Sequence, residues 1–330
     1  MDNLNRPKLG LALSGAAARS VFYIGFLEVL QENQIHIDYI SANSGACIVA
    51  AAFACGTLSE LKEKALSMDK EFLFSIIQRS KDKGGLYSMD KVEEAFQKYT
   101  KGMNFEQVRP LMGFTCTNIN SGEEIILTMG DIAKAISASC ALPGIFKPVR
   151  WGQWDLVDGG LVSIVPGHAA RTAGCDAVIG IYVSPKERVF NNFEIAIKKT
   201  VNFFYRLFGF HGARRMFRSF MSVLEKNKYF SYFYDLEEAE PKTSGMFEIL
   251  GKAMDIAIKA QNKQHLLPPN FDCDFIIRPT LPTESAFKRL SYLYLADFSG
   301  SKRLYEFGRQ TATSSLPRIK NLLLEKSKEL

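Results

Sequence analysis

The sequence lacks several features that mark particular classes of protein. No apolar run in its 330 residues approaches the roughly 20 residues of a transmembrane helix. The N-terminal segment MDNLNRPK has no long apolar core followed by a small-residue cleavage site, so we expect no secretory signal. The net charge of +6 is modest for this length and favours anionic surfaces without indicating a fold. These absences predict a cytoplasmic protein, in which any membrane contact would be peripheral.

Motifs for metal binding and redox chemistry are also missing. The six cysteines show no CxxC spacing and mostly lie in apolar surroundings, which predicts reduced, buried thiols. The four histidines show no metal-ligand spacing such as HxxxH. His168 could complete a catalytic triad, but a structural role is favoured for it. The sequence therefore predicts no metal site and no cofactor.

Strand-like and helical segments alternate along the chain, whose 47% hydrophobic and 23% charged residues are typical of a soluble globular protein. A C-terminal helix is expected from Ser301, with a restart near Pro317. This alternation predicts an α/β fold with a mostly parallel sheet covered on both faces. The expected strands include residues 8–14, 114–118, 153–157, 176–184 and 275–278.

The stretch from Ile37 to Gly56, IDYISANSGACIVAAAFACG, predicts a strand, a tight turn and a helix of small residues. Ser44 lies at the turn. A serine at a sharp strand-to-helix turn is the nucleophile-elbow arrangement, which exposes the hydroxyl above the sheet. The usual signature is G-x-S-x-G, and here both flanking glycines are alanine, Ala42 and Ala46.

The segment 190–240 does not follow the strand–helix alternation. Between Phe190 and Asp235 it contains fourteen aromatic residues and eight lysines and arginines, with aromatics at helical spacing. This composition suits a helical pair lying in a membrane interface. It suits equally a pair whose aromatic face packs on the domain. The amphipathic placement argues against a third alternative, nucleic-acid binding.

Four pieces in order carry a family resemblance. LSGAAAR (13–19) is similar to a glycine-rich G-G-G-x-[RK] loop, and the Ser44 turn follows it. ASCALPGIF (138–146) is similar to A-S-x-A-x-P-x-x-F, and VDGGLV (157–162) is similar to D-G-[GA]. Together they resemble the patatin-like phospholipases, bacterial lipid acyl hydrolases. The resemblance implies a three-layer α/β/α sandwich, with residues 1–330 as a single domain that contains 190–240 as an insert.

The resemblance also implies a Ser–Asp dyad that needs no histidine, with Ser44 as nucleophile and Asp158 as base. A carboxylate can take the serine proton as Oγ attacks an ester carbonyl. On the residues alone, Asp158 could instead be a turn former and Arg19 a helix-entry charge. The backbone N–H groups for the oxyanion would come from Gly15, Ala16 and Ala17. The supporting residues would be Arg19, Gly45, Gly159 and Gly160.

The chain departs from the family pattern wherever alanine stands for glycine. In the elbow the question is room for a β-carbon, and in the Gly15-Ala16-Ala17 loop it is backbone torsion. Alanine keeps its N–H, and Gly45 directly after Ser44 could absorb strain. These mild replacements favour a compensated active site.

The leading functional hypothesis is a lipid acyl hydrolase, similar to phospholipase A or lysophospholipase, that acts on membrane lipid esters. The alternative is a catalytically weak or inactive patatin-fold protein that binds lipid or a protein partner. The predicted partners are an acyl-ester lipid and a membrane surface contacted through residues 190–234, with no nucleic acid. The sequence indicates neither head group, chain length nor oligomeric state.

Overall fold

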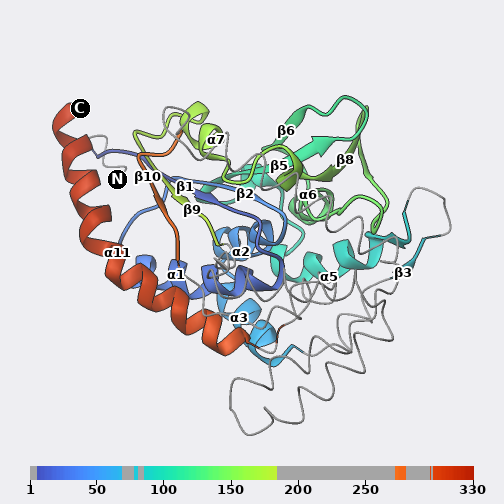
Figure 1. Cartoon of the computed structure of the whole chain (residues 1–330), viewed down its shortest axis with the longest axis horizontal. Coiled ribbons are helices and arrows are strands. Elements are labelled where there is room, and N and C mark those ends of the chain that lie inside the picture. Colours follow the sequence, from blue (N-terminus) through green and yellow to red (C-terminus); the bar gives the residue numbers. More distant parts are fainter. Residues whose placement is uncertain (1–5, 69–77, 81–84, 184–271, 280–297, 299) are drawn as a thin grey trace, which may run out of the picture. The chain divides into compact units, whose positions relative to one another are not determined.

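The computed structural model describes residues 6–68, 78–80, 85–183, 272–279, 298 and 300–330 (Figure 1). The segment 190–240 lies outside these residues, so its helical pairing and its role stay predictions. Within the described ranges, no helix combines the length and apolar character needed to cross a bilayer.

Eight strands form one sheet in the order β10-β9-β1-β2-β5-β8-β7, and β6 also pairs with β5. The first five strands of this order run parallel, whereas β6 and β8 run antiparallel to β5. The predicted mostly parallel sheet is therefore confirmed. A separate antiparallel pair joins β3 (Gln78–Arg79) and β4 (Tyr87–Ser88). The strands of the large sheet are β1 (Leu9–Leu13), β2 (Tyr39–Asn43), β5 (Leu111–Asn118), β6 (Glu124–Leu127), β7 (Val149–Trp151), β8 (Trp154–Asp158), β9 (Ala177–Ile181) and β10 (Phe275–Ile277).

Helices cover both faces of the sheet, which gives the three-layer α/β/α sandwich (Figure 1). The α-helices are α1 (Val21–Glu32), α2 (Gly45–Ala54), α3 (Leu58–Ser67), α5 (Asp90–Thr100), α6 (Ile132–Ser139), α7 (Gly167–Thr172) and α11 (Ser301–Glu329). The short 3-10 helices are η1 (Ala17–Ser20), η2 (Phe105–Gln107) and η3 (Gly159–Leu161).

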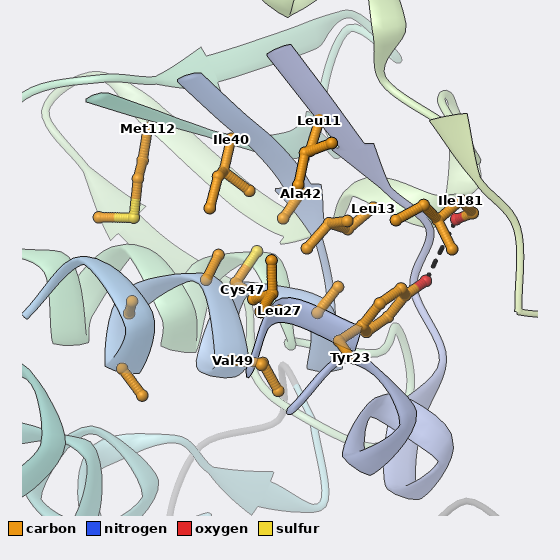
Figure 2. Close-up of a cluster of buried hydrophobic side chains, with 14 of the residues drawn as sticks. Leu11, Leu13, Tyr23, Leu27, Ile40, Ala42, Cys47, Val49, Met112 and Ile181 are labelled. Carbon is orange, nitrogen blue, oxygen red and sulfur yellow. Dashed lines mark hydrogen bonds between the residues drawn. The ribbon is translucent and has the colours of Figure 1, made fainter. Parts of the chain in front are cut away.

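Side chains of β1 alternate between two cores. Leu9, Leu11 and Leu13 enter the larger core, whereas Ala12 enters a smaller core on the α7 side. In Figure 2, Leu11, Leu13, Ile40 and Ala42 point from the strands towards Leu27 and Cys47. Burying each such leucine contributes about 1.5–3 kcal/mol. The apolar runs that predicted these strands are thus the middle layer of the sandwich.

The C-terminal helix α11 continues through Pro317, so the predicted restart at this residue is wrong. Proline lacks an N–H and normally kinks or ends a helix. Here α11 is held on both sides of the proline. Ala312 and Ile319 are fully buried, and the guanidinium of Arg318 lies 4.0 Å from the ring centroid of Phe275. Tertiary packing therefore overrides the local signal.

Two glycines let α11 lie directly on α1. A β-carbon at Gly25 would overlap the carbonyl oxygen of Tyr305, and one at Gly308 would overlap that of Phe22. Glu28 of α1 stabilises the contact between α1 and α11. Its carboxylate accepts a hydrogen bond from the Tyr305 hydroxyl of α11 at 2.6 Å and pairs with Lys62 of α3 at 2.8 Å.

Gly308→Ala should destabilise the protein, although alanine favours a helix by about 1 kcal/mol. The added methyl group meets backbone and forces the helices apart, which costs typically 1–3 kcal/mol. We expect a net loss in the free energy of unfolding measured in urea. Gly300→Ala is the control, because its β-carbon would meet no described atom within 4 Å. Equal stability of the two variants would contradict this packing.

Candidate active site

Ser44 lies between β2 and α2, as the strand–turn–helix pattern predicted. Its φ of 51° and ψ of −137° belong to a region that residues other than glycine rarely adopt. Such a conformation costs on the order of 1–3 kcal/mol and persists only where the surroundings hold it. Ser44 is half-buried, while Asn43 and Gly45 are buried. The turn therefore presents one partly exposed serine on a buried frame.

The two alanines that flank the turn fit without opening it. Ala42 and Ala46 are both fully buried in the core between β2 and α2. The position that requires glycine is Gly45, where a β-carbon would lie 2.7 Å from Ser20 Oγ and 2.9 Å from the Ala17 carbonyl oxygen. Thus Gly45 allows η1 to approach the turn.

Strand register brings Ser44 and Asp158 together. β6 occupies one edge of β5 from Phe114 to Thr117, so β2 and β8 must share the other edge. On that edge Asn43 is paired with Thr115, and Asp158 is paired with the next residue, Cys116. Because β2 is parallel to β5 and β8 is antiparallel, their C-terminal ends meet head-on. Ser44 follows Asn43 at this meeting point.

Asp158 is 3% exposed, and the two oxygens of its carboxyl group have different surroundings. Oδ1 accepts a hydrogen bond from the Gly160 N–H at 2.8 Å, which is the turn-former role. Oδ2 is buried and has no partner of normal hydrogen-bond geometry among the described residues. The Ser44 hydroxyl lies near the carboxylate and lowers the pKa of Asp158, but it does not reach normal hydrogen-bond geometry with Oδ2. Oδ2 is the oxygen left to take a proton.

Burial sets the proton affinity of Asp158. Desolvation raises its pKa from 3.8 to about 6, and the Ser44 hydroxyl and the Gly160 amide offset only part of this rise. A carboxylate with this pKa is mostly ionised at pH 7 and accepts a proton more readily than an exposed aspartate. It is therefore suited to general-base chemistry.

Gly159 allows the turn after Asp158 to lie directly against the backbone of β5. A β-carbon at this position would overlap the carbonyl oxygen of Thr115. The Asp158 N–H donates to the Ala141 carbonyl oxygen at 3.0 Å, in the loop after α6. These contacts fix the backbone from which the carboxylate projects.

The Gly15-Ala16-Ala17 loop lies against the Ser44 turn. A β-carbon at Gly15 would be 2.7 Å from Asn43 Oδ1 and 3.0 Å from Ser44 Cβ. Among the described residues, the N–H groups of Gly15 and Ala16 donate no hydrogen bond. Ala17 has a φ of 47°, the left-handed torsion that glycine reaches more easily. The loop thus keeps its donors beside Ser44 at a cost in backbone strain.

Arg19 follows this loop in η1 and is half-buried. Its backbone N–H donates to the Ala16 carbonyl oxygen at 2.9 Å, so the Arg19 backbone contributes to the shape of the loop. At the start of the loop, the Ser14 hydroxyl lies 3.0 Å from the Tyr23 hydroxyl and accepts from the Val183 N–H at 3.0 Å. The loop is therefore tied to the ends of β1 and β9.

Two polar side chains that sequence analysis gave no role bind the site together. Ser139 accepts a hydrogen bond from the Ser44 N–H at 2.8 Å. The Asn43 amide donates to the carbonyl oxygen of Ser163 and, at 3.3 Å, to that of Ile164. Ser139 stands inside the ASCALPGIF motif, so the motif located it without indicating its partners.

The remaining candidates lie apart from this chemistry. His168 Nε2 is 2.8 Å from Glu124 Oε2, and this contact raises the pKa of His168. Cys47, Cys116 and Cys140 lie near Asp158, but burial raises their thiol pKa values well above normal, which disfavours a thiolate nucleophile. All six cysteines are free. The described residues contain no group of three or more histidine, cysteine or acidic side chains that could hold a metal ion.

Comparison with known proteins gives a family match. The patatin-like phospholipase family model matches residues 11–171. An uncharacterized NTE family protein of Mycobacterium tuberculosis is 28% identical over 178 residues, which cover 54% of this chain and 49% of that protein. Lysophospholipase NTE1 of Saccharomyces cerevisiae is 25% identical over 199 residues, 54% of this chain and 11% of that protein.

Two solved structures show weaker likeness. VipD from Legionella pneumophila gives a TM-score of 0.39 at 14% identity, covering 94% of this chain and 67% of VipD. The ExoU–SpcU complex of Pseudomonas aeruginosa gives a TM-score of 0.32 at 16% identity, covering 58% of this chain and 46% of the matched chain. These scores are too low to carry an argument.

The matched region spans about half the length of the mycobacterial relative, so the similarity applies to one domain of that protein. That domain contains Ser44, Asp158 and the Gly15 loop, the three parts that the fold brings together. Residues 11–171 therefore form a patatin-like phospholipase domain.

Proposed function

We propose that this protein is a lipid acyl hydrolase that uses Ser44 and Asp158 as a catalytic dyad. The observation that carries the proposal is the head-on meeting of β2 and β8 on one edge of β5, with Asp158 buried beside Ser44. The family match supports hydrolysis of lipid esters in general. The lysophospholipase name of the yeast relative supports a phospholipid or lysophospholipid substrate.

In the first half of the reaction, Asp158 takes the proton of Ser44 as Oγ attacks the ester carbonyl carbon. Negative charge develops on the carbonyl oxygen, which the N–H groups of Gly15, Ala16 and Ala17 would stabilise. The tetrahedral intermediate then breaks its bond to the alcohol, which leaves with the proton held by Asp158. The product is an acyl ester on Ser44.

In the second half, Asp158 is again ionised and takes a proton from water as the water attacks the acyl ester. Collapse of the second tetrahedral intermediate releases the fatty acid and returns the proton to Ser44. The pKa of about 6 suits both steps, because Asp158 must accept and release a proton in each cycle.

The proposed substrate is a phospholipid or another acyl-ester lipid presented at a membrane surface. Contact with that surface through residues 190–234 remains part of the proposal, because these residues lie outside the described structure. A cytoplasmic, peripherally membrane-associated location fits this substrate.

A fluorophosphonate probe tests the dyad directly. We expect the wild-type protein to be labelled on Ser44, Ser44→Ala to remain unlabelled, and Asp158→Asn to react at least about a hundredfold more slowly, because general-base assistance contributes 10²–10⁴-fold. Asp155→Asn is the matched control, because Asp155 lies on the same strand with its carboxylate paired to Arg150 at the surface.

The wild-type result separates the two functional hypotheses. Absence of labelling on correctly folded wild-type protein would refute the esterase proposal and indicate a patatin-fold protein that binds lipid or protein without turnover. Equal slowing by Asp155→Asn and Asp158→Asn would refute a specific role for Asp158.

The raised pKa of Asp158 predicts two pH dependences. The value of kcat/KM for an ester substrate should fall as the pH drops below about 6, because the protonated carboxyl cannot act as a base.

The folded state also binds the Asp158 proton more tightly than the unfolded state does. Asp158 therefore lowers the stability of the wild type, relative to Asp158→Asn, as the pH rises from about 4 to 6, by on the order of 3 kcal/mol.

Urea unfolding of wild type and Asp158→Asn at several pH values measures this stability difference. We expect the variant to gain relative to the wild type up to pH 6, and the gap to stay constant above it. A gap that does not change between pH 4 and 6 would show that Asp158 titrates normally.

A further inference from the structure

The hydroxyl group of Ser139 makes every hydrogen bond that a serine can make. Ser139 is the last residue of α6 and is fully buried. Its Oγ donates to the Thr115 carbonyl oxygen at 2.7 Å. It accepts from the Ser44 N–H at 2.8 Å and from the Cys47 thiol at 3.3 Å. A hydroxyl has one donor and two acceptor positions, so all three are occupied.

These partners connect the three elements that meet at the site. Thr115 lies on β5, Ser44 directly follows β2, and Cys47 lies in the first turn of α2. Two residues after Ser139, the Ala141 carbonyl oxygen accepts from the Asp158 N–H at 3.0 Å. The segment 139–141 therefore fixes the backbone of both reactive residues.

The bond to the Ser44 N–H has two consequences. It restrains the backbone of Ser44 directly at the strained φ of 51°. It also occupies the Ser44 amide, so this N–H is not available to a substrate oxyanion, and the donors left beside Ser44 are those of the Gly15 loop.

We propose that Ser139 is a positioning residue that holds the Ser44 backbone in its reactive conformation through the Ser44 N–H. The proposal rests on the proposed function, because it assigns Ser139 a part in the reactivity of Ser44. Loss of the hydroxyl leaves a buried N–H and a buried carbonyl without their partner and lets the turn relax. Ser139 itself does not touch the reacting atoms.

Residues on the same elements provide matched controls. Ser137 is also fully buried on α6, but its Oγ has no hydrogen-bond partner among the described residues. Ser137→Ala therefore removes a buried hydroxyl without touching Ser44. Cys47→Ala removes the thiol bond to Ser139 but not the bonds of Ser139 to the Ser44 N–H and the Thr115 carbonyl oxygen. A change caused by general loosening of α6 would appear in Ser137→Ala as well.

The experiment measures the rate of fluorophosphonate labelling of Ser44, together with kcat and KM for a p-nitrophenyl fatty-acid ester. For Ser139→Ala we expect labelling and kcat at least tenfold lower, with KM changed by less than twofold. Ser137→Ala should stay within twofold of the wild type, and Cys47→Ala within threefold. Ser139→Cys, which nearly keeps the side-chain size but is a weak acceptor, covers the case that Ser139→Ala does not fold.

The outcomes distinguish this proposal from the proposed function. If the wild type is not labelled, the esterase proposal itself fails. If the wild type is labelled and the folded Ser139 variants react at the wild-type rate, the positioning role is overturned. Equal slowing in Ser137→Ala, or a rise in KM with unchanged kcat, would also overturn it.

Discussion

The site depends on the way two strands share one edge of β5. β6 occupies the opposite edge. On the shared edge, the pairing of β2 stops at Thr115, and the pairing of β8 takes over at Cys116. The two strands approach from opposite directions, and their C-terminal residues meet. A serine after one strand and an aspartate at the end of the other are then neighbours, although more than 100 positions separate them in the chain.

Close contacts surround this meeting point, and glycines make them possible. Gly15 lies against Asn43 and Ser44, Gly45 against η1, and Gly159 against the Thr115 carbonyl group. In contrast, Ala42 and Ala46 are buried between strand and helix, where a methyl group fits. The chain thus keeps glycine where a β-carbon would come too close to neighbouring atoms. Ala17 is the exception, because its φ of 47° is a cost that glycine would largely avoid.

The sequence predicted the parts of this arrangement better than their connections. Apolar runs predicted β1, β2 and β9, and family motifs singled out Ser44 and Asp158. The head-on meeting follows from the register of β5 with three strands, which no local pattern encodes. The same holds for the bonds of Ser139 and Asn43, and for Pro317, where packing on α1 and Phe275 keeps α11 continuous. Residues 190–240 lie outside the described structure, so their role still rests on composition.

We propose that this meeting point makes Ser44 a nucleophile served by a buried carboxylate. The most direct test is mass spectrometry of the protein quenched during turnover of a p-nitrophenyl fatty-acid ester. We expect one acyl group per molecule, on the peptide that contains Ser44, and none in Ser44→Ala. Turnover with the acyl group on another residue, or equal turnover by Ser44→Ala, would contradict it.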